Sequence, residues 1–330
     1  MEKISLNLVI ALFLLVVIGC KKLPDGHLSS LIRYEVQPFQ IQQGRTDVSS
    51  SLNSEGSSKP FTVKLLNIYD RETGQNVTDI FSAAYPTKIW TALYNPKIDT
   101  TLEMINAKRT DVMLPAIAIN AMSGQIEANP LTENLPLGKY KFDLEIENSA
   151  GRRIYPNIGE FDLIAAPTFE IPLVRSTVAM KVGNESVTTT IPSNNTHIQV
   201  TRVGNQEDKI IVRFLDKNGA VFDPRTEIQR RPIGGISVGF LQTMQDYSLS
   251  TSVSADRFEF IYAVVPFPLE SLGNGFNYYY RIPAQFVEYD ASLNLPYNTY
   301  SCNARFSFRV FSPGTYQVDV IIPQVTRRAP

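Results

Sequence analysis

The chain has 330 residues, and its 31 lysines and arginines nearly balance 32 aspartates and glutamates, leaving a net charge of −1. This balance excludes the broad basic surface that nucleic acid requires, so no nucleic-acid partner is expected. The length is typical of two domains, and a hydrophobic content of 43% supplies a buried core for each.

The N-terminus indicates an exported lipoprotein. The apolar run Ile4 to Ile18 is short for a membrane span, and a small residue, Gly19, precedes Cys20. Val17 to Cys20 resembles the lipobox of bacterial lipoproteins, which implies that 1–19 is a cleaved signal peptide and that Cys20 carries lipid. An ordinary apolar helix or strand is the competing interpretation, but no cap or amphipathic period follows.

The lipid would hold the chain to the cell envelope as an outer-membrane lipoprotein, with the periplasmic or surface face left open. Residues 20–30 are then a lipidated tether. Only one other thiol, Cys302, is present, so no internal disulfide is expected, and Cys302 itself is expected to be a small core residue.

Residues 31–165 have the pattern of a first β-sandwich. Clusters of Pro, Gly, Asn and Asp separate short apolar segments, which are Arg33 to Ile41, Phe61 to Tyr69, Lys88 to Tyr94, Ala116 to Asn120, Tyr140 to Glu147 and Glu160 to Ile164. Tyr140 to Glu147 alternates apolar and charged side chains, which predicts one face on a second sheet and one in solvent. Trp90 falls in a strand pattern and is expected in the sandwich core.

Helix is expected only in short pieces. One turn is expected at Asp79 to Ala84, and a capping-box spacing at Thr100 to Glu103 leads into Met104 to Lys108. The segments Ile117 to Pro130 and Leu135 to Gly151 resemble the closing half of a cadherin-like or immunoglobulin-like bacterial domain. The acidic junction motifs with which cadherin repeats bind calcium are absent, so calcium is not implied.

Residues 166–330 predict a second, aromatic-rich β-sandwich. Its expected strands are Thr177 to Val182, Ile198 to Arg202, Lys209 to Leu215 and Phe258 to Val265. Ser312 to Pro323 repeats the Pro, Gly, Tyr and alternating-strand pattern of Leu135 to Ile146, which favours two tandem domains. The predicted fold is therefore all-β, with two tandem immunoglobulin-like β-sandwich domains after a lipoprotein signal peptide.

The aromatic residues of the second half suggest a binding surface. Neighbouring strand residues point to opposite faces, so consecutive rings cannot all be buried on one side. The candidate ligand or partner surface comprises Asn277, Tyr278, Tyr279, Tyr280 and Arg281. A competing interpretation places these rings in the core of the sandwich.

The residues for catalysis are sparse. His27 lies in the tether and His197 follows a turn, so neither a histidine triad nor a zinc site is expected. Carboxylates that could pair in a glycosidase are Asp246, Glu259, Glu270, Glu288 and Asp290, but the sequence does not bring two of them together. Gly234 to Gly239 lacks the Lys-Ser/Thr of a phosphate loop and indicates a flexible loop. No enzyme activity, metal or cofactor is expected.

The layout as a whole resembles an uncharacterised family of bacterial envelope lipoproteins associated with SusC/SusD-type glycan-import systems, with a SusE/SusF-like arrangement. The lipobox at Cys20, the tether, the immunoglobulin-like first domain and the Tyr/Phe-rich second domain carry this resemblance. It implies a non-catalytic protein that binds polysaccharide or assists outer-membrane transporter proteins. The alternative is a structural or adhesion lipoprotein that docks a protein partner through the second domain.

Overall fold

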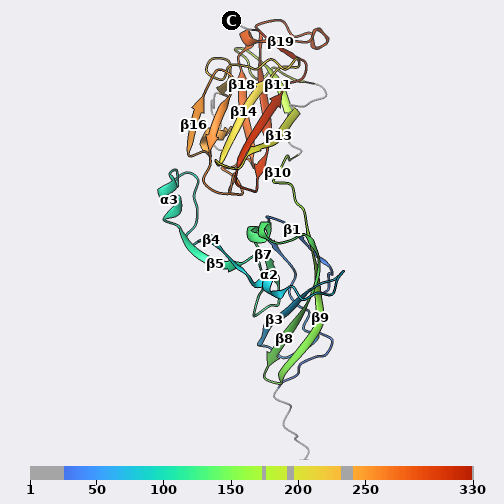
Figure 1. Ribbon diagram of the computed structural model, residues 1–330. Helices are drawn as coiled ribbons and strands as arrows, with labels where there is room; N and C mark the ends of the chain where they lie inside the picture. Colours follow the sequence, from blue (N-terminus) through green and yellow to red (C-terminus); the bar gives the residue numbers. More distant parts are fainter. Residues whose placement is uncertain (1–25, 173–175, 192–196, 232–240, 329–330) are drawn as a thin grey trace, which may run out of the picture. The chain divides into compact units, whose positions relative to one another are not determined.

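The computed structural model describes residues 26–172, 176–191, 197–231 and 241–328 (Figure 1). The chain forms two compact units. Residues up to Thr87 and Val112–Ala166 make the first unit, and Lys88–Asp111 with the residues from Pro167 onward make the second. The predicted lipid site Cys20 and the glycine-rich segment Gly234 to Gly239, which is expected to be a flexible loop, lie outside the described residues. In the described part of the chain, no helix has the length and apolar character needed to cross a membrane.

Two sheets enclose the core of the first unit. The four-stranded sheet runs through β1 (Phe39–Gln42), β9 (Gly151–Ile164), β8 (Gly138–Asn148) and β3 (Phe61–Asp70). The three-stranded sheet runs through β2 (Asp47–Val48), β7 (Ile126–Ala128) and β6 (Ile117–Ile119). The β1–β9 pair is parallel, and the other pairs are antiparallel.

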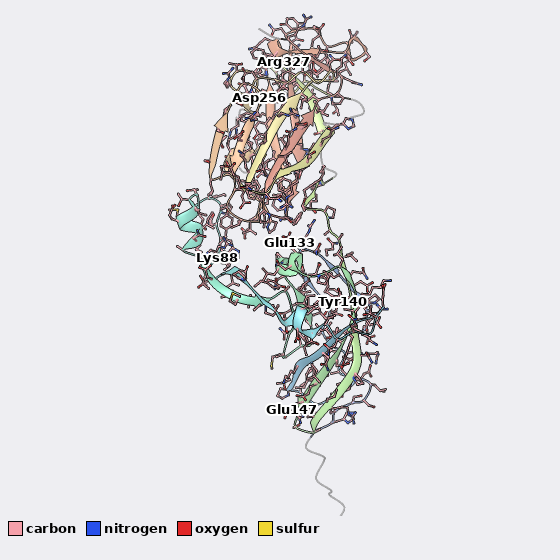
Figure 2. The ribbon with its side chains drawn as sticks, in the orientation of Figure 1. Lys88, Glu133, Tyr140, Glu147, Asp256 and Arg327 are labelled. Atoms are coloured by element: carbon pink, nitrogen blue, oxygen red, sulfur yellow. The ribbon has the colours of Figure 1, made fainter. Side chains whose placement is uncertain are left out.

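Strand β8 follows the predicted alternation with one exception. Its apolar positions Tyr140, Phe142, Leu144 and Ile146 are all buried (Figure 2 labels Tyr140). Asp143 is buried as well, because the register of β8 against both neighbours shifts beside it. Its carboxylate accepts hydrogen bonds from the Asn157 backbone at 2.7 Å and from the Tyr69 hydroxyl at 3.1 Å. A buried carboxylate with such partners avoids the cost of an unpaired charge.

Both sheets of the second unit have five strands. One runs through β12 (Thr188–Thr190), β11 (Ser176–Lys181), β20 (Tyr300–Ser307), β18 (Asn277–Ile282) and β15 (Gln229–Arg230). The other runs through β13 (His197–Gly204), β22 (Thr315–Ile321), β14 (Lys209–Leu215), β17 (Phe258–Ile261) and β16 (Ser250–Val253). Two short ladders pair β10 (Phe169–Glu170) with β21 (Arg309–Val310), and β19 (Val287–Tyr289) with β23 (Val325–Arg327). The expectation of an all-β, multi-domain β-sandwich protein is confirmed.

Aromatic rings from both five-stranded sheets fill the core of the second unit. The Phe214 ring of β14 lies 5.1 Å from the Tyr280 ring of β18 and 5.9 Å from the Phe306 ring of β20, both edge-on. Edge-to-face aromatic pairs at these distances add stability beyond the area that they bury. Cys302 is also fully buried, as expected.

The repeat noticed in the sequence has a structural counterpart. The Tyr140 hydroxyl donates to the Pro136 carbonyl oxygen at 2.8 Å, and the Tyr316 hydroxyl donates to the Ser312 carbonyl oxygen at 2.8 Å. Both tyrosines are buried, and each bond spans four residues. This is the geometry of a tyrosine corner, which is typical of immunoglobulin-like sandwiches.

Within the described ranges the helices are short, as predicted. They are α2 (Thr78–Ser82), α3 (Leu102–Asn106) and the 3₁₀ turns η1 (Pro130–Asn134), η3 (Met244–Asp246), η4 (Ala284–Phe286) and η5 (Ala291–Leu293). The α3 helix is capped by Thr101, whose side chain accepts from the Met104 amide at 3.3 Å. It lies between β4 (Ala84–Trp90) and β5 (Arg109–Pro115), which form a separate two-stranded ribbon (Figure 2 labels Lys88).

Candidate functional site

Strand β18 divides the predicted surface residues between its two faces. Tyr278 and Tyr280 are 0% and 2% exposed, and their rings contact the aromatic core through Phe306. Asn277 and Tyr279 point the other way and are half-buried. The expectation that all three tyrosines lie on the surface is therefore corrected, because strand alternation sends every second side chain inward.

Arg281 is on the outward face of β18, yet it is only 8% exposed. Its Nε donates to the Asn303 Oδ1 at 2.8 Å, and its Nη2 lies 2.8 Å from the Glu185 Oε1. The arginine is thus not the open residue that the sequence predicts. Of the predicted surface, only Asn277 and Tyr279 are partly exposed.

Trp90 is not in a sandwich core. It ends β4 with 37% of its surface exposed, because the β4–β5 ribbon belongs to neither sandwich sheet. The Arg109 guanidinium lies 5.4 Å from the Trp90 ring centroid, and the Tyr94 ring lies 5.6 Å from it. A cation this close to an indole face is attracted by the ring quadrupole. The expected core position of Trp90 is wrong.

A pocket of about 230 Å³ lies in the second unit. One wall comes from the segment that follows β4, and the other from the residues around η3 and after β17. The lining residues used below are Tyr94, Asp99, Asp246, Tyr247 and Phe267. The site therefore combines aromatic rings with carboxylates, which is the usual composition of a small-molecule site.

The aromatic core fixes the Tyr247 wall. The Tyr247 ring lies edge-on to Phe267 at 6.5 Å and to the buried Tyr278 at 5.9 Å. Its hydroxyl accepts from the Leu272 amide at 3.2 Å, which leaves its own proton to donate. Burial raises the pKa of Tyr247 to about 12, so this donor keeps its proton at neutral pH.

On the opposite wall, Asp99 makes hydrogen bonds that link residues of the segment after β4. Its Oδ2 accepts from the Lys108 Nζ at 2.7 Å and from the Asn95 amide at 2.6 Å. The hydrogen bond from Lys108 is the largest cause, and together the two bonds lower the pKa of Asp99 below its usual value. The other oxygen, Oδ1, accepts no hydrogen bond from the described residues and can take one from a ligand. Burial, followed by the charges of Asp99 and Glu270, raises the pKa of Tyr94.

The carboxylates considered for catalysis are dispersed. Asp246 pairs with Arg230 in the pocket wall, while Glu259 pairs with Lys209 and Arg257 elsewhere in the unit. Glu288 pairs with Arg328, and Asp290 pairs with Lys217. Glu270 is exposed.

Neither histidine lines the pocket. His197 begins β13 and is exposed, and exposed His27 donates from its backbone to the Ser58 Oγ. Among the described residues, no three His, Cys, Asp or Glu side chains are grouped closely enough to hold a metal ion.

No family model and no curated protein matches the sequence. Among solved structures, the chain is similar to a SusE-like surface-located polysaccharide-binding protein from the heparin utilisation locus of Bacteroides thetaiotaomicron. The TM-score is 0.26 at 11% identity, over 88% of this chain and 53% of that chain. This chain thus spans about half the length of that protein, and a likeness at this level leaves function to be argued from the pocket.

Sequence reasoning did not find the pocket. Tyr94 and Tyr247 are far apart in the chain, and no local pattern links them. The available signal was the stretch between the strand pattern at Lys88 to Tyr94 and the short helix expected from Met104, where apolar residues follow neither a strand nor a helix period. Ile98, for example, is exposed.

Proposed function

We propose that this protein is a non-catalytic outer-membrane lipoprotein that binds a glycan in the pocket between Tyr94 and Tyr247. The observation that carries the proposal is the pairing of two tyrosine rings with two carboxylates in one concavity. The apolar faces of a sugar ring pack on aromatic side chains, while its hydroxyls need donors and acceptors. The tyrosine hydroxyls and the Asp99 Oδ1 supply both.

The size of the pocket favours one sugar ring or the end of a chain. Small-molecule pockets span about 300–1,000 Å³, and this one is slightly smaller, at about 230 Å³. A longer polysaccharide would therefore leave most of its length in solvent. The exposed Trp90, next to Tyr94, is placed to contact the adjoining sugar.

The carboxylates of the pocket suit binding better than hydrolysis. A glycosidase needs one carboxyl group that stays protonated near neutral pH beside a second that is ionised. Asp99 and Asp246 each lie within 2.7 Å of a cationic nitrogen, and the pKa of Asp99 is lowered. Both groups therefore act as hydrogen-bond acceptors.

The lipobox around Cys20 supports the envelope location, and the resemblance in layout supports a role beside a SusC/SusD-type uptake system. In this role the lipid holds the chain at the membrane, and the second unit captures glycan for the transporter. Catalysis is left to other proteins.

The test uses the soluble chain from Pro24 onward on a glycan array and in affinity gels. Tyr94→Ala and Tyr247→Ala should each lower glycan affinity about tenfold or more, the loss expected for truncating an aromatic anchor. Tyr297→Ala, an exposed tyrosine of the same unit outside the pocket lining, is the matched control. Tyr279→Ala tests the predicted β18 surface. Loss of binding in Tyr279→Ala alone, or no binding to any glycan, would contradict the proposal that the pocket binds glycan.

A second function is favoured by one observation. The segment Lys88–Asp111 exposes several large apolar side chains, and these are Ile89, Trp90, Leu93, Ile98, Leu102 and Met104. Exposed apolar groups of this kind often mark protein interfaces. If the protein docks a transporter instead of a glycan, Leu93→Glu with Ile98→Glu should abolish co-purification with that transporter, while Tyr247→Ala should leave it unchanged.

A further inference from the structure

Three arginines gather on the outward face of the sheet that contains β18. Arg281 of β18 is opposite Asn303 of β20, and Tyr279 is opposite Arg305, so Arg281 and Arg305 are diagonal neighbours on one face. Such neighbours are about 7–8 Å apart. Arg231, which directly follows β15, joins them through a shared carboxylate.

That carboxylate is Glu185, in the turn between β11 and β12. Its Oε1 lies 2.8 Å from the Arg281 Nη2, and its Oε2 lies 3.4 Å from the Arg231 Nη2. Arg305 makes no ion pair with any described residue. Three guanidinium charges and one carboxylate leave this face with an excess of two positive charges.

Two guanidinium donors on this face have no acceptor. The Nε atoms of Arg231 and Arg305 are buried, and neither has a hydrogen-bond partner among the described residues. An unsatisfied donor of a charged group is costly, and most proteins avoid it. A guanidinium that turns its Nε–Nη edge toward an oxyanion makes two parallel hydrogen bonds. These bonds give the Nε donor an acceptor and pair the positive charge with a negative one.

We propose that Arg231, Arg281 and Arg305 form an oxyanion site for a sulfate or carboxylate group. Glu185, which is 41% exposed, bridges two of these arginines much as such a group would. The bound oxyanion adds the missing charge and the missing acceptors. This site is separate from the tyrosine pocket and does not depend on the proposed glycan binding there.

The test compares three probes with the soluble chain from Pro24 onward by calorimetry at constant ionic strength: dextran, dextran sulfate and inorganic sulfate. Dextran and dextran sulfate share one backbone and differ in the sulfate groups. Dextran sulfate should bind and dextran should not bind through this face. Binding of inorganic sulfate at the same site would indicate that a free ion suffices, while a preference for dextran sulfate would indicate a sulfated chain.

The variants separate a built site from general attraction. Arg305→Gln should weaken dextran sulfate binding about tenfold or more, the loss expected for a charge-assisted hydrogen bond. Arg225→Gln removes the same charge from an exposed position of the same unit and should change little. Glu185→Gln should tighten binding, a gain that misfolding cannot produce, and Tyr94→Ala should leave it unchanged.

Three results would overturn the proposal. One is an equal loss in Arg225→Gln and Arg305→Gln, which would indicate non-specific attraction. The other is weaker or unchanged binding in Glu185→Gln. The third is the absence of binding by both dextran sulfate and inorganic sulfate.

Discussion

The Tyr316 hydroxyl donates to the carbonyl oxygen of Ser312, four residues earlier and 2.8 Å away. The Tyr140 hydroxyl makes the same bond to Pro136 in the first unit. Each bond ties a buried ring to the loop before a central strand of its sandwich. The two units thus begin β8 and β22 in the same way.

Removing either hydroxyl should destabilise only the unit that contains it. Tyr316→Phe and Tyr140→Phe each lose the hydrogen bond of the corner, which is worth about 0.5–1.5 kcal/mol of the free energy of unfolding. Hydrogen exchange measured separately on β8 and β22 reports the two units. Faster exchange in the other unit, or in neither, contradicts a local role for the corner.

The Cys302 thiol should be inert in the folded protein. Burial raises its pKa to about 12, so almost no thiolate exists at pH 8. In the soluble chain from Pro24 onward Cys302 is the only thiol, and a disulfide reagent should label it only after denaturation. Rapid labelling of the native protein would show that β20 opens readily.

The Asp99 contacts should survive mild acid. The pKa of Asp99 is lowered in the folded chain, so its contribution is complete above the unfolded value of about 3.9 and is lost as the pH falls through the lower, folded value. Protonation of Asp99 should therefore not change glycan binding between pH 5 and pH 8.

Removing the Asp99 carboxylate by mutation should weaken glycan binding, whereas acid between pH 5 and pH 8 should not. Asp99→Asn should speed exchange of the Asn95 amide, which donates to this carboxylate, and weaken glycan binding. Asp111→Asn, an exposed carboxylate on the β4–β5 ribbon paired with Lys88, is the control and should do neither. Equal effects from the two variants would show that Asp99 has no special role.

Cys20 should carry the lipid. A fatty-acid analogue fed to expressing cells should label the full chain and its Cys302→Ser variant equally, and should not label Cys20→Ser. Mass spectrometry of the N-terminal peptide should place the modification on Cys20. Labelling of Cys20→Ser would remove the basis for the membrane tether.

The sequence predicts those elements whose pattern is local. Alternation in β8 marks its buried face because side chains in a strand point to opposite sides with a period of two. The shared Pro-Gly-Tyr pattern likewise anticipates the two tyrosine corners. Asp143 departs from the alternation because a register shift depends on the partner strand, which the sequence of β8 does not contain.

The candidate sites depend on contacts between distant segments. The strand pattern around Trp90 does not say whether a second sheet covers it, and in this chain none of the sandwich sheets includes β4. Tyr94 and Tyr247 line one pocket only because Lys88–Asp111 belongs to the second unit. Tyr278 and Tyr280 face the core because of the way β18 pairs with its neighbouring strands. The run of aromatic residues in the sequence does not specify which of them point inward.

The most direct test of the account is an NMR map of bound glycan on the soluble chain from Pro24 onward. Titration with a glycan identified on the array should shift the amides of Asn95–Thr100 and Gln245–Leu249, the two walls of the pocket, and leave those of β18 nearly unchanged. Shifts confined to the outward face of β18, or no shifts in either wall under saturating glycan, would contradict the central claim.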